Sequence, residues 1–285
     1  MKPIKDIILS TETRWYPVLF RHCAHLFEGV FLPSHDHLHH ARVWYGARSL
    51  LLQLERSGLQ IPEPIPEQLI IAAFFHDTGL TRTYGEEHGR ESRLLCEEFL
   101  NNPAQSVRKP EKESYNAILH SIEHHDDKSL KPGAPDVRSS QPPDLLNLLS
   151  AGDDLDAFGN IGIYRYAEIN LLRGIEPEQL PLKVSKNVRN RFDNLKSSFR
   201  EQEKFIRDQE DRFRQVYDFY LRLSQAFAGR NEKPSWEPVL IELFHESLHQ
   251  QVNLLKPDRV IPRTGFDNEI AEWFSSLDAE ILNTS

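Results

Sequence analysis

The chain has 285 residues, enough to bury a sizeable core, and 39% hydrophobic with 27% charged residues is ordinary for a globular protein. A net charge of −9 argues against a non-specific nucleic-acid-binding protein, which usually carries a basic face. A nucleotide substrate stays open, because a metal ion can offset phosphate charge. Two cysteines suggest neither a disulfide framework nor a cysteine-based zinc site. No apolar run is long enough for a signal peptide or a membrane span, so we expect a cytoplasmic protein.

Apolar residues recur at helical spacing along almost the whole chain, and hardly any segment alternates as a strand does. The sequence therefore predicts an all-α fold. The predicted helices cover residues 13–28, 36–57, 66–77, 87–101, 111–125, 143–158, 160–173, 186–228, 235–253 and 267–282. Proline and glycine residues separate these segments, and residues 127–143 form a polar, proline-rich loop.

The segment from about residue 185 to residue 228 is highly charged and carries apolar residues at helical spacing. We expect a long amphipathic helix that is broken near residue 200. Its apolar face either packs on the rest of the chain or forms a dimer interface, so a homodimer remains open.

One histidine of the predicted 36–57 helix lies close to the apolar face. His39 precedes Val43 by four residues, which places both on one side of the helix, whereas His37 and His40 point elsewhere. A buried histidine is often only a hydrogen-bonded core residue. His39 becomes a candidate ligand only in combination with others.

A second candidate pair follows a run of apolar residues. Residues 69–75 are all apolar and end at His76 and Asp77, with Gly79 as the expected end of the helix. A helix that is apolar all round is buried, so these two side chains need a partner. That partner is either a metal ion or an internal salt bridge.

The third candidate comes from three aspartates in the predicted 143–158 helix. Asp153 follows Leu146 by seven residues and Leu149 by four, and therefore shares their apolar face. Asp154 lies on the polar face, and Asp156 again tends inward. Asp153 is the candidate inner carboxylate, with Asp156 as its neighbour.

Together these residues make a plausible site for a divalent metal ion. Imidazole nitrogen combined with carboxylate oxygen suits Mn, Mg, Co, Fe, Ni or Zn, and the absence of thiolate disfavours soft metals. The predicted metal ligands are His39, His76, Asp77 and Asp153.

Four segments resemble one family in order and spacing. Residues 35–43 (HDHLHHARV) resemble the HDxxHxxRV opening of the HD-superfamily phosphohydrolases, and residues 72–79 (AAFFHDTG) resemble its HD motif. Residues 151–158 (AGDDLDAF) look like its closing motif. Residues 159–165 (GNIGIYR) are similar to the continuation in small bacterial HD nucleotide hydrolases. The resemblance covers roughly residues 20–175.

The resemblance implies an HD-domain helical bundle with additional C-terminal helices. We divide the chain into an HD domain at 1–180 and a helical extension at 181–285, which packs on the core or forms an oligomer interface. Carried across, the family's ligands fall on the four residues chosen above. Asp77 would also orient the attacking water and so act in catalysis. The chain departs from the family at Asp154, where a basic residue is common.

Further histidines leave the number of metal ions, one or two, undecided. Residues 88–92 (HGRES) and 122–126 (IEHHD) resemble motifs of the binuclear branch of the superfamily. The histidines concerned, His88, His124 and His125, either hold a second ion or line the pocket, where they would bind phosphate or position water. No GYP element follows His125, so a cyclic-di-GMP phosphodiesterase is not expected.

The resemblance thus implies an enzyme that hydrolyses a phosphoester or phosphoanhydride of a small phosphorylated substrate, with a nucleotide expected, through a metal-activated water. The expected catalytic residues are Asp77 and His125. Candidate side chains for binding the substrate phosphate are Arg82, Arg90, Lys128 and Arg165.

Two other functions remain as alternatives. The first is a di-iron oxygenase similar to inositol oxygenase, for which His88 with His124 or His125 would supply the further ligands. The second is a non-catalytic HD fold that serves as a sensor or scaffold, although all four primary ligands are present.

Overall fold

The structure is a computed structural model of the chain, and it describes residues 2–103, 109–126, 144–230, 234–256 and 258–283. All regular secondary structure within these residues is helical, which confirms the predicted fold class. The α-helices are α1 (Ile4–Leu26), α2 (His37–Arg56), α3 (Ile65–Phe75), α4 (His88–Asn101), α5 (Lys112–His124), α6 (Leu145–Asp156), α7 (Gly159–Leu172), α8 (Leu180–Ser198), α9 (Glu203–Phe227), α10 (Glu237–Gln250) and α11 (Asp267–Asn283). Two short 3₁₀ helices are η1 (Thr78–Thr81) and η2 (Pro177–Gln179).

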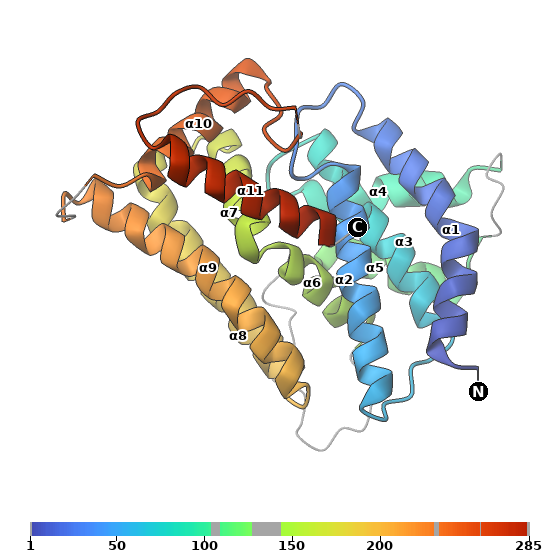
Figure 1. Cartoon of the computed structure of the whole chain (residues 1–285). Coiled ribbons are helices and arrows are strands. Elements are labelled where there is room, and N and C mark those ends of the chain that lie inside the picture. The colour runs from blue at the N-terminus through green and yellow to red at the C-terminus, as the bar shows by residue number, and fades with distance from the viewer. Residues whose placement is uncertain (1, 104–108, 127–143, 231–233, 257, 284–285) are drawn as a thin grey trace.

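Helix α3 is the centre of the N-terminal part of the fold. It contacts α1, α2, α5 and α6, and its residues from Leu69 to Phe75 are all buried. A short helix with apolar residues on every side is stable only when other helices surround it. The N-terminal part in Figure 1 has this arrangement, with α1, α2, α5 and α6 around α3.

Helix α1 begins at Ile4 rather than at residue 13, where the sequence analysis expected it. Its buried face includes Ile4, Ile8, Trp15 and Leu19, so the apolar spacing of the helix already starts at its first residue. The start at residue 13 was therefore wrong, because Ile4, Ile7 and Ile8 already have helical spacing.

Helices α2 and α6, which carry candidate ligands, both begin at an aspartate cap. The side chain of Asp36 accepts a hydrogen bond from the backbone N–H of Leu38 (2.9 Å), and Asp144 does the same for Asn147 (2.8 Å). These caps fix the first turn of each helix. The two helices then pack against each other over much of their length.

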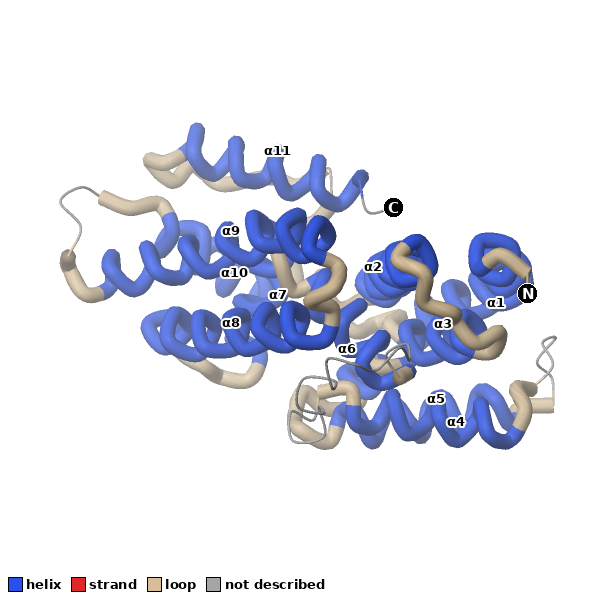
Figure 2. The backbone as a smooth tube through the Cα atoms, turned by 90° about the horizontal axis from the view of Figure 1, so that it is seen from below, coloured by secondary structure: helices blue, strands red, loops and turns tan. Residues whose placement is uncertain are grey.

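The C-terminal helices form the other part of the molecule (Figures 1 and 2). The expected break near residue 200 is confirmed, because α8 ends at Ser198 and α9 begins at Glu203. The two helices pack side by side, with the rings of Phe192 and Phe213 stacked at 4.4 Å. Helix α8 also contacts α6, and α9 contacts α7 and α10. Among the helices described, none combines the length and the apolarity needed to cross a membrane.

Candidate metal centre

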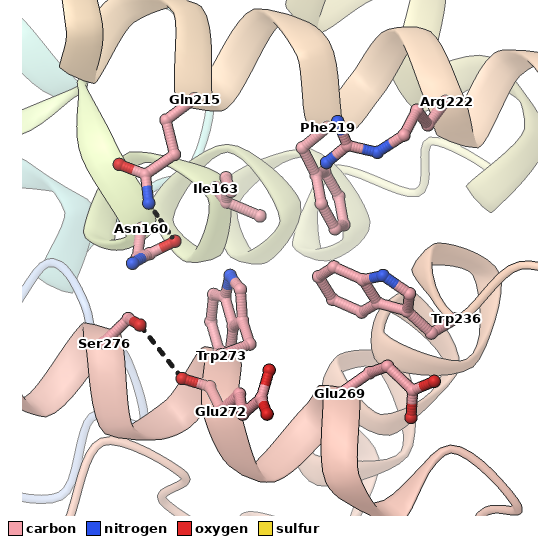
Figure 3. Close-up of a pocket in the computed structure, with 10 residues that line it drawn as sticks. All are labelled: Asn160, Ile163, Gln215, Phe219, Arg222, Trp236, Glu269, Glu272, Trp273 and Ser276. Atoms are coloured by element: carbon pink, nitrogen blue, oxygen red, sulfur yellow. Dashed lines mark hydrogen bonds between the residues drawn. The ribbon is translucent and has the colours of Figure 1, made fainter.

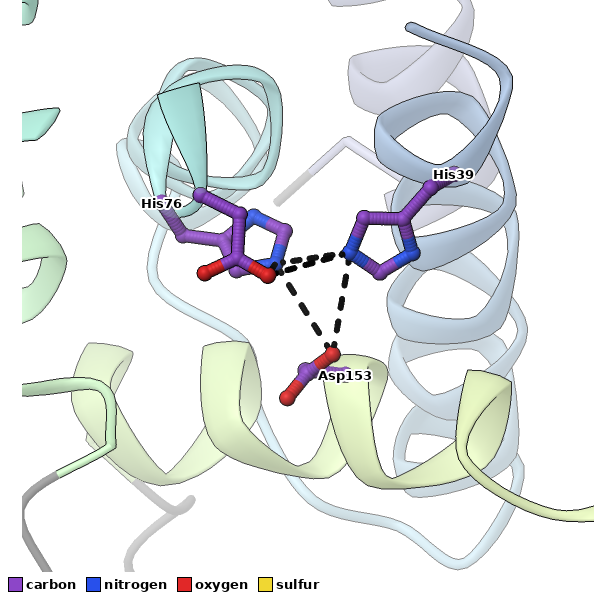
Figure 4. Close-up of side chains that lie close together, drawn as sticks. His39, His76 and Asp153 are labelled. Atoms are coloured by element: carbon purple, nitrogen blue, oxygen red, sulfur yellow. Dashed lines mark hydrogen bonds and ion pairs between the residues drawn. The ribbon is translucent and has the colours of Figure 1, made fainter. Parts of the chain in front are cut away.

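A first cluster gathers four buried side chains from α2, α6 and the turn after α3. Figure 4 labels three of them, His39, His76 and Asp153. His39 lies in the first turn of α2, His76 and Asp77 directly follow α3, and Asp153 lies on α6. Each offers one ligand atom, these atoms all lie within 4.8 Å of one another, and no residue of the four is more than 6% exposed. Helix α3 ends at Phe75, two residues earlier than expected, so the pair lies at the turn into η1.

Hydrogen bonds turn the same nitrogen of both imidazoles towards the cluster. The Nδ1 atom of His39 lies 2.7 Å from Asp156 Oδ2, and Nδ1 of His76 lies 2.9 Å from the carbonyl oxygen of Ala73. Neither oxygen can donate a proton, so each Nδ1 is the donor. In the neutral rings both Nε2 atoms then carry lone pairs, and these atoms face each other at 3.1 Å. Two nitrogen lone pairs that face each other suit a cation bound to both atoms.

The carboxylates complete a donor set that fits a divalent ion. Asp77 Oδ2 lies 3.5 Å from the Nε2 atoms of both His39 and His76, and Asp153 Oδ1 lies 3.8 Å from both. Ligand atoms bound at about 2.1 Å to one ion lie roughly 3.0 to 4.2 Å apart. The four separations fall in this range. Two imidazoles and two carboxylates are donors for hard or borderline divalent metals.

A second cluster shares Asp77 with the first. Its Oδ1 atom lies 3.0 Å from Nε2 of His125 and 3.5 Å from Nε2 of His88. The Nδ1 atoms of these rings donate to the carbonyl oxygens of Ile122 (2.8 Å) and Gly85 (2.9 Å). The two oxygens of Asp77 therefore face two different groups of histidines.

Two glycines allow the close helix contacts behind this second cluster. A Cβ atom at Gly79 would lie 2.0 Å from the carbonyl oxygen of His88, so only glycine lets η1 pack on the start of α4 and places His88 beside Asp77. A Cβ atom at Gly89 would lie 2.5 Å from the carbonyl oxygen of Glu123. Glycine at this position therefore lets α4 pack closely on the last turn of α5. The histidines thus depend on backbone contacts that larger residues would block.

The ionised form of Asp77 and the protonated form of His125 stabilise each other. Burial alone would raise the pKa of Asp77, but the charge of His76 and hydrogen bonds from His125, His39 and His88 outweigh it and hold this pKa well below its ordinary value. Burial likewise opposes the charge on His125, yet its hydrogen bond to Asp77 raises the pKa of His125 to about 9. A metal ion at the second cluster would replace that proton.

Two arginines neutralise the carboxylate of Asp153 from the side. Arg165, on α7, lies 2.9 Å from Asp153 Oδ1 and 3.2 Å from His39 Nε2, to which it donates. Arg191, on α8, lies 2.7 Å from both Asp153 Oδ2 and Asp154 Oδ1. Burial alone would raise the pKa of Asp153, but these guanidinium groups and a neighbouring histidine hold it well below its ordinary value.

Arg191 was not among the predicted site residues. The one hint of a basic partner from elsewhere in the chain was Asp154, which stands where the resembling family often has a basic residue. In the structure Asp154 is 2% exposed, and α8 supplies the basic group from elsewhere in the chain. Asp156 does turn inward as expected, where Arg42 binds both of its oxygens (2.7 and 3.1 Å) and it accepts from His39.

Several predicted residues lie away from the two clusters. Arg82 is exposed and forms ion pairs with two glutamates, and Arg90 is exposed without contact to the clusters. The ring of His124 packs against His120 at 4.7 Å, and His124 belongs to neither cluster of possible metal ligands. Lys128 lies outside the described residues. Of the basic candidates that the structure describes, Arg165 is the one that contacts a cluster residue, Asp153.

Comparison with protein-family models matches residues 38–157 to the HD domain. The comparisons with curated proteins and with solved structures found no match. All six cluster residues lie within the matched segment, and residues 38–157 are thereby identified as an HD domain. HD domains bind divalent metals, and most members of the family are metal-dependent hydrolases. Arg165 and Arg191 lie beyond the match.

Proposed function

We propose that this protein is a metal-dependent phosphohydrolase that cleaves a phosphoester or phosphoanhydride bond of a small phosphorylated substrate, with nucleotides as the first class to test. The observation that carries the proposal is the position of Asp77. One of its oxygens faces His39 and His76, and the other faces His88 and His125. Such a shared carboxylate is suited to hold two ions next to each other.

We assign His39, His76, Asp77 and Asp153 to one ion, and Asp77, His88 and His125 to a second ion. Divalent ions held there would lower the pKa of a coordinated water and polarise a phosphoryl oxygen. The protein's own part is to fix these donors. Every histidine of the set has its Nδ1 atom tied to a backbone carbonyl or a carboxylate, so each ring is held in one orientation.

We propose Arg165 as the residue that meets the substrate phosphate. Its side chain is buried beside Asp153, and its Nε atom has no hydrogen-bond partner among the described residues. A planar guanidinium group with an unused donor suits a phosphoryl oxygen. Its positive charge would also stabilise the negative charge that develops during hydrolysis.

We also propose that the extension at 181–285 completes this site. Helix α8 packs on α6, and its Arg191 contacts the ligand Asp153. A carboxylate that binds a metal with one oxygen is commonly held by a hydrogen bond to the other. Arg191 is positioned for that role and acts through Asp153.

The proposal is tested by measuring metal content and phosphate release in one set of variants. The wild type, loaded with Mn, Co, Fe or Mg, is assayed on a panel of nucleotides and other phosphate esters. We expect His39→Ala and Asp153→Asn to lose bound metal and activity together. His125→Ala should lose one ion, whereas the neighbouring His124→Ala should retain the metal content and the activity of the wild type.

Oxygen uptake is measured in the same samples, because the same donors suit two irons. Phosphate release without oxygen supports the hydrolase. Oxygen consumption on substrate addition, with no phosphate released anaerobically, would replace the proposal by the oxygenase alternative. Metal retained by both His39→Ala and Asp153→Asn would show that the site assignment is wrong.

A further inference from the structure

A cavity in the C-terminal part of the molecule lies away from the metal centre (Figure 3). It is lined by residues of α7, α9 and α11 and by Trp236, which directly precedes α10. Its volume is about 270 Å³. Aromatic side chains form much of its wall: Phe219, Trp236 and Trp273. The rings of Phe219 and Trp236 lie 5.6 Å apart, and Figure 3 shows both with Trp273 among the residues that line the cavity. Glu269 and Glu272 of α11 lie at its edge.

The charges around this cavity are unbalanced. Helix α11 carries five acidic residues and no basic one. Three of the five bind a basic side chain or a backbone N–H of the chain: Asp267, Asp278 and Glu280. The carboxylates of Glu269 and Glu272 have no ion-pair partner among the described residues, and both line the cavity. The one basic residue of the lining, Arg222, is already neutralised by the buried Glu237.

A buried donor also faces this cavity. Trp273 is 6% exposed, and its Nε1 atom has no hydrogen-bond partner among the described residues. In Figure 3 this nitrogen points to the side of the cavity formed by Asn160 and Ile163. A buried N–H without a partner costs free energy, so an acceptor on a bound molecule would be favoured there.

We propose that this cavity binds a small organic ammonium ion that also carries a hydrogen-bond acceptor. The faces of the aromatic rings attract a cation, and the two unpaired carboxylates add to that attraction. The same carboxylates repel phosphate and other anions, so a nucleotide is not the expected ligand. The volume lies below the range of about 300 to 1,000 Å³ for drug-sized ligands, which favours a small molecule. This proposal does not depend on the hydrolase activity.

Choline is a suitable probe, because it combines a quaternary ammonium group with a hydroxyl oxygen. Calorimetric titration of the full chain should show binding of choline. Its neutral isostere 3,3-dimethyl-1-butanol should bind about tenfold more weakly or not at all, because it lacks the charge. Equal binding of the two compounds, or no binding of choline, would overturn the proposal.

Variants separate the two features of the ligand. The double variant Glu269→Gln with Glu272→Gln should lower the affinity for choline about tenfold. The control is Glu242→Gln, which removes an exposed carboxylate of α10 outside the cavity and should leave the affinity unchanged. Unchanged affinity in the double variant would refute the charge argument.

The indole donor is tested with a second probe. Trp273→Phe keeps an aromatic ring and removes the N–H group. It should weaken the binding of choline but not that of tetramethylammonium, which has no acceptor. Equal loss for both probes would show that the N–H group plays no part in recognition. Circular dichroism of each variant checks that the helices remain folded.

Discussion

Replacing Arg191 by alanine tests whether α8 belongs to the metal centre. The guanidinium contacts Asp153 Oδ2 and Asp154 Oδ1 at 2.7 Å, and both carboxylate side chains are at most 6% exposed. Removing one partner of a buried ion pair costs about 3 to 5 kcal/mol. We expect the lower end, about 3 kcal/mol, because Asp153 keeps Arg165 and Arg191 itself is partly exposed. For a chain of this length, whose unfolding entropy is about 0.6 kcal/mol/K, that loss lowers Tm by roughly 5 °C.

The assay is thermal unfolding in the presence of EDTA and again with excess Mn²⁺. Because Arg191 is proposed to hold Asp153 for the ion, Arg191→Ala should bind Mn²⁺ more weakly than the wild type, so its loss of Tm should be larger with Mn²⁺ than with EDTA. Arg189→Ala is the matched control on the same helix. Arg189 contacts Tyr217 at the surface, and its loss should change stability by no more than about 0.5 kcal/mol. Equal Tm values for the two variants in EDTA would refute the reasoning.

Two further substitutions test the contacts behind the ligands. Gly89→Ala should lower the free energy of unfolding by about 2 kcal/mol or more, because its Cβ atom would lie 2.5 Å from the carbonyl oxygen of Glu123. Urea unfolding measures this loss, and a value below about 0.5 kcal/mol would contradict the prediction. Asp156→Asn should weaken metal binding about 10- to 100-fold, because the Asp156 carboxylate orients the His39 ring through its Nδ1 atom. Competition with a chelating dye measures the metal affinity, and an unchanged affinity would count against this role of Asp156.

Helical spacing predicted the parts of the site that lie within single helices. His39 and Asp153 were chosen over their neighbours because each lies on an apolar face, and both join the first cluster. The expectation that His40 and Asp154 point away from the interior was wrong, because both are buried as well. Such counting gives the direction of a side chain on its own helix, because that direction follows from the positions of the apolar residues around it.

The contacts between distant segments could not be predicted in this way. Arg191 looks like any other basic residue of a charged amphipathic helix, and its role depends on how α8 folds back on α6. The close approach at Gly89 likewise depends on where α5 lies against α4. Spacing along one helix carries no information on which other helix will face it, so these residues became visible only in the structure.

The contact between α8 and the ligand helix also has a consequence for how the protein is made. Arg191 follows Asp153 by 38 residues, and it lies beyond the segment that matches the HD domain. During synthesis the ribosome therefore releases all the proposed ligands before it releases this arginine. Until α8 emerges and docks, the nascent HD domain holds a cluster of buried acids that lacks one of its counter-charges. A chain cut after residue 180 would remain in that state, so this truncation is expected to fold less stably than the full chain.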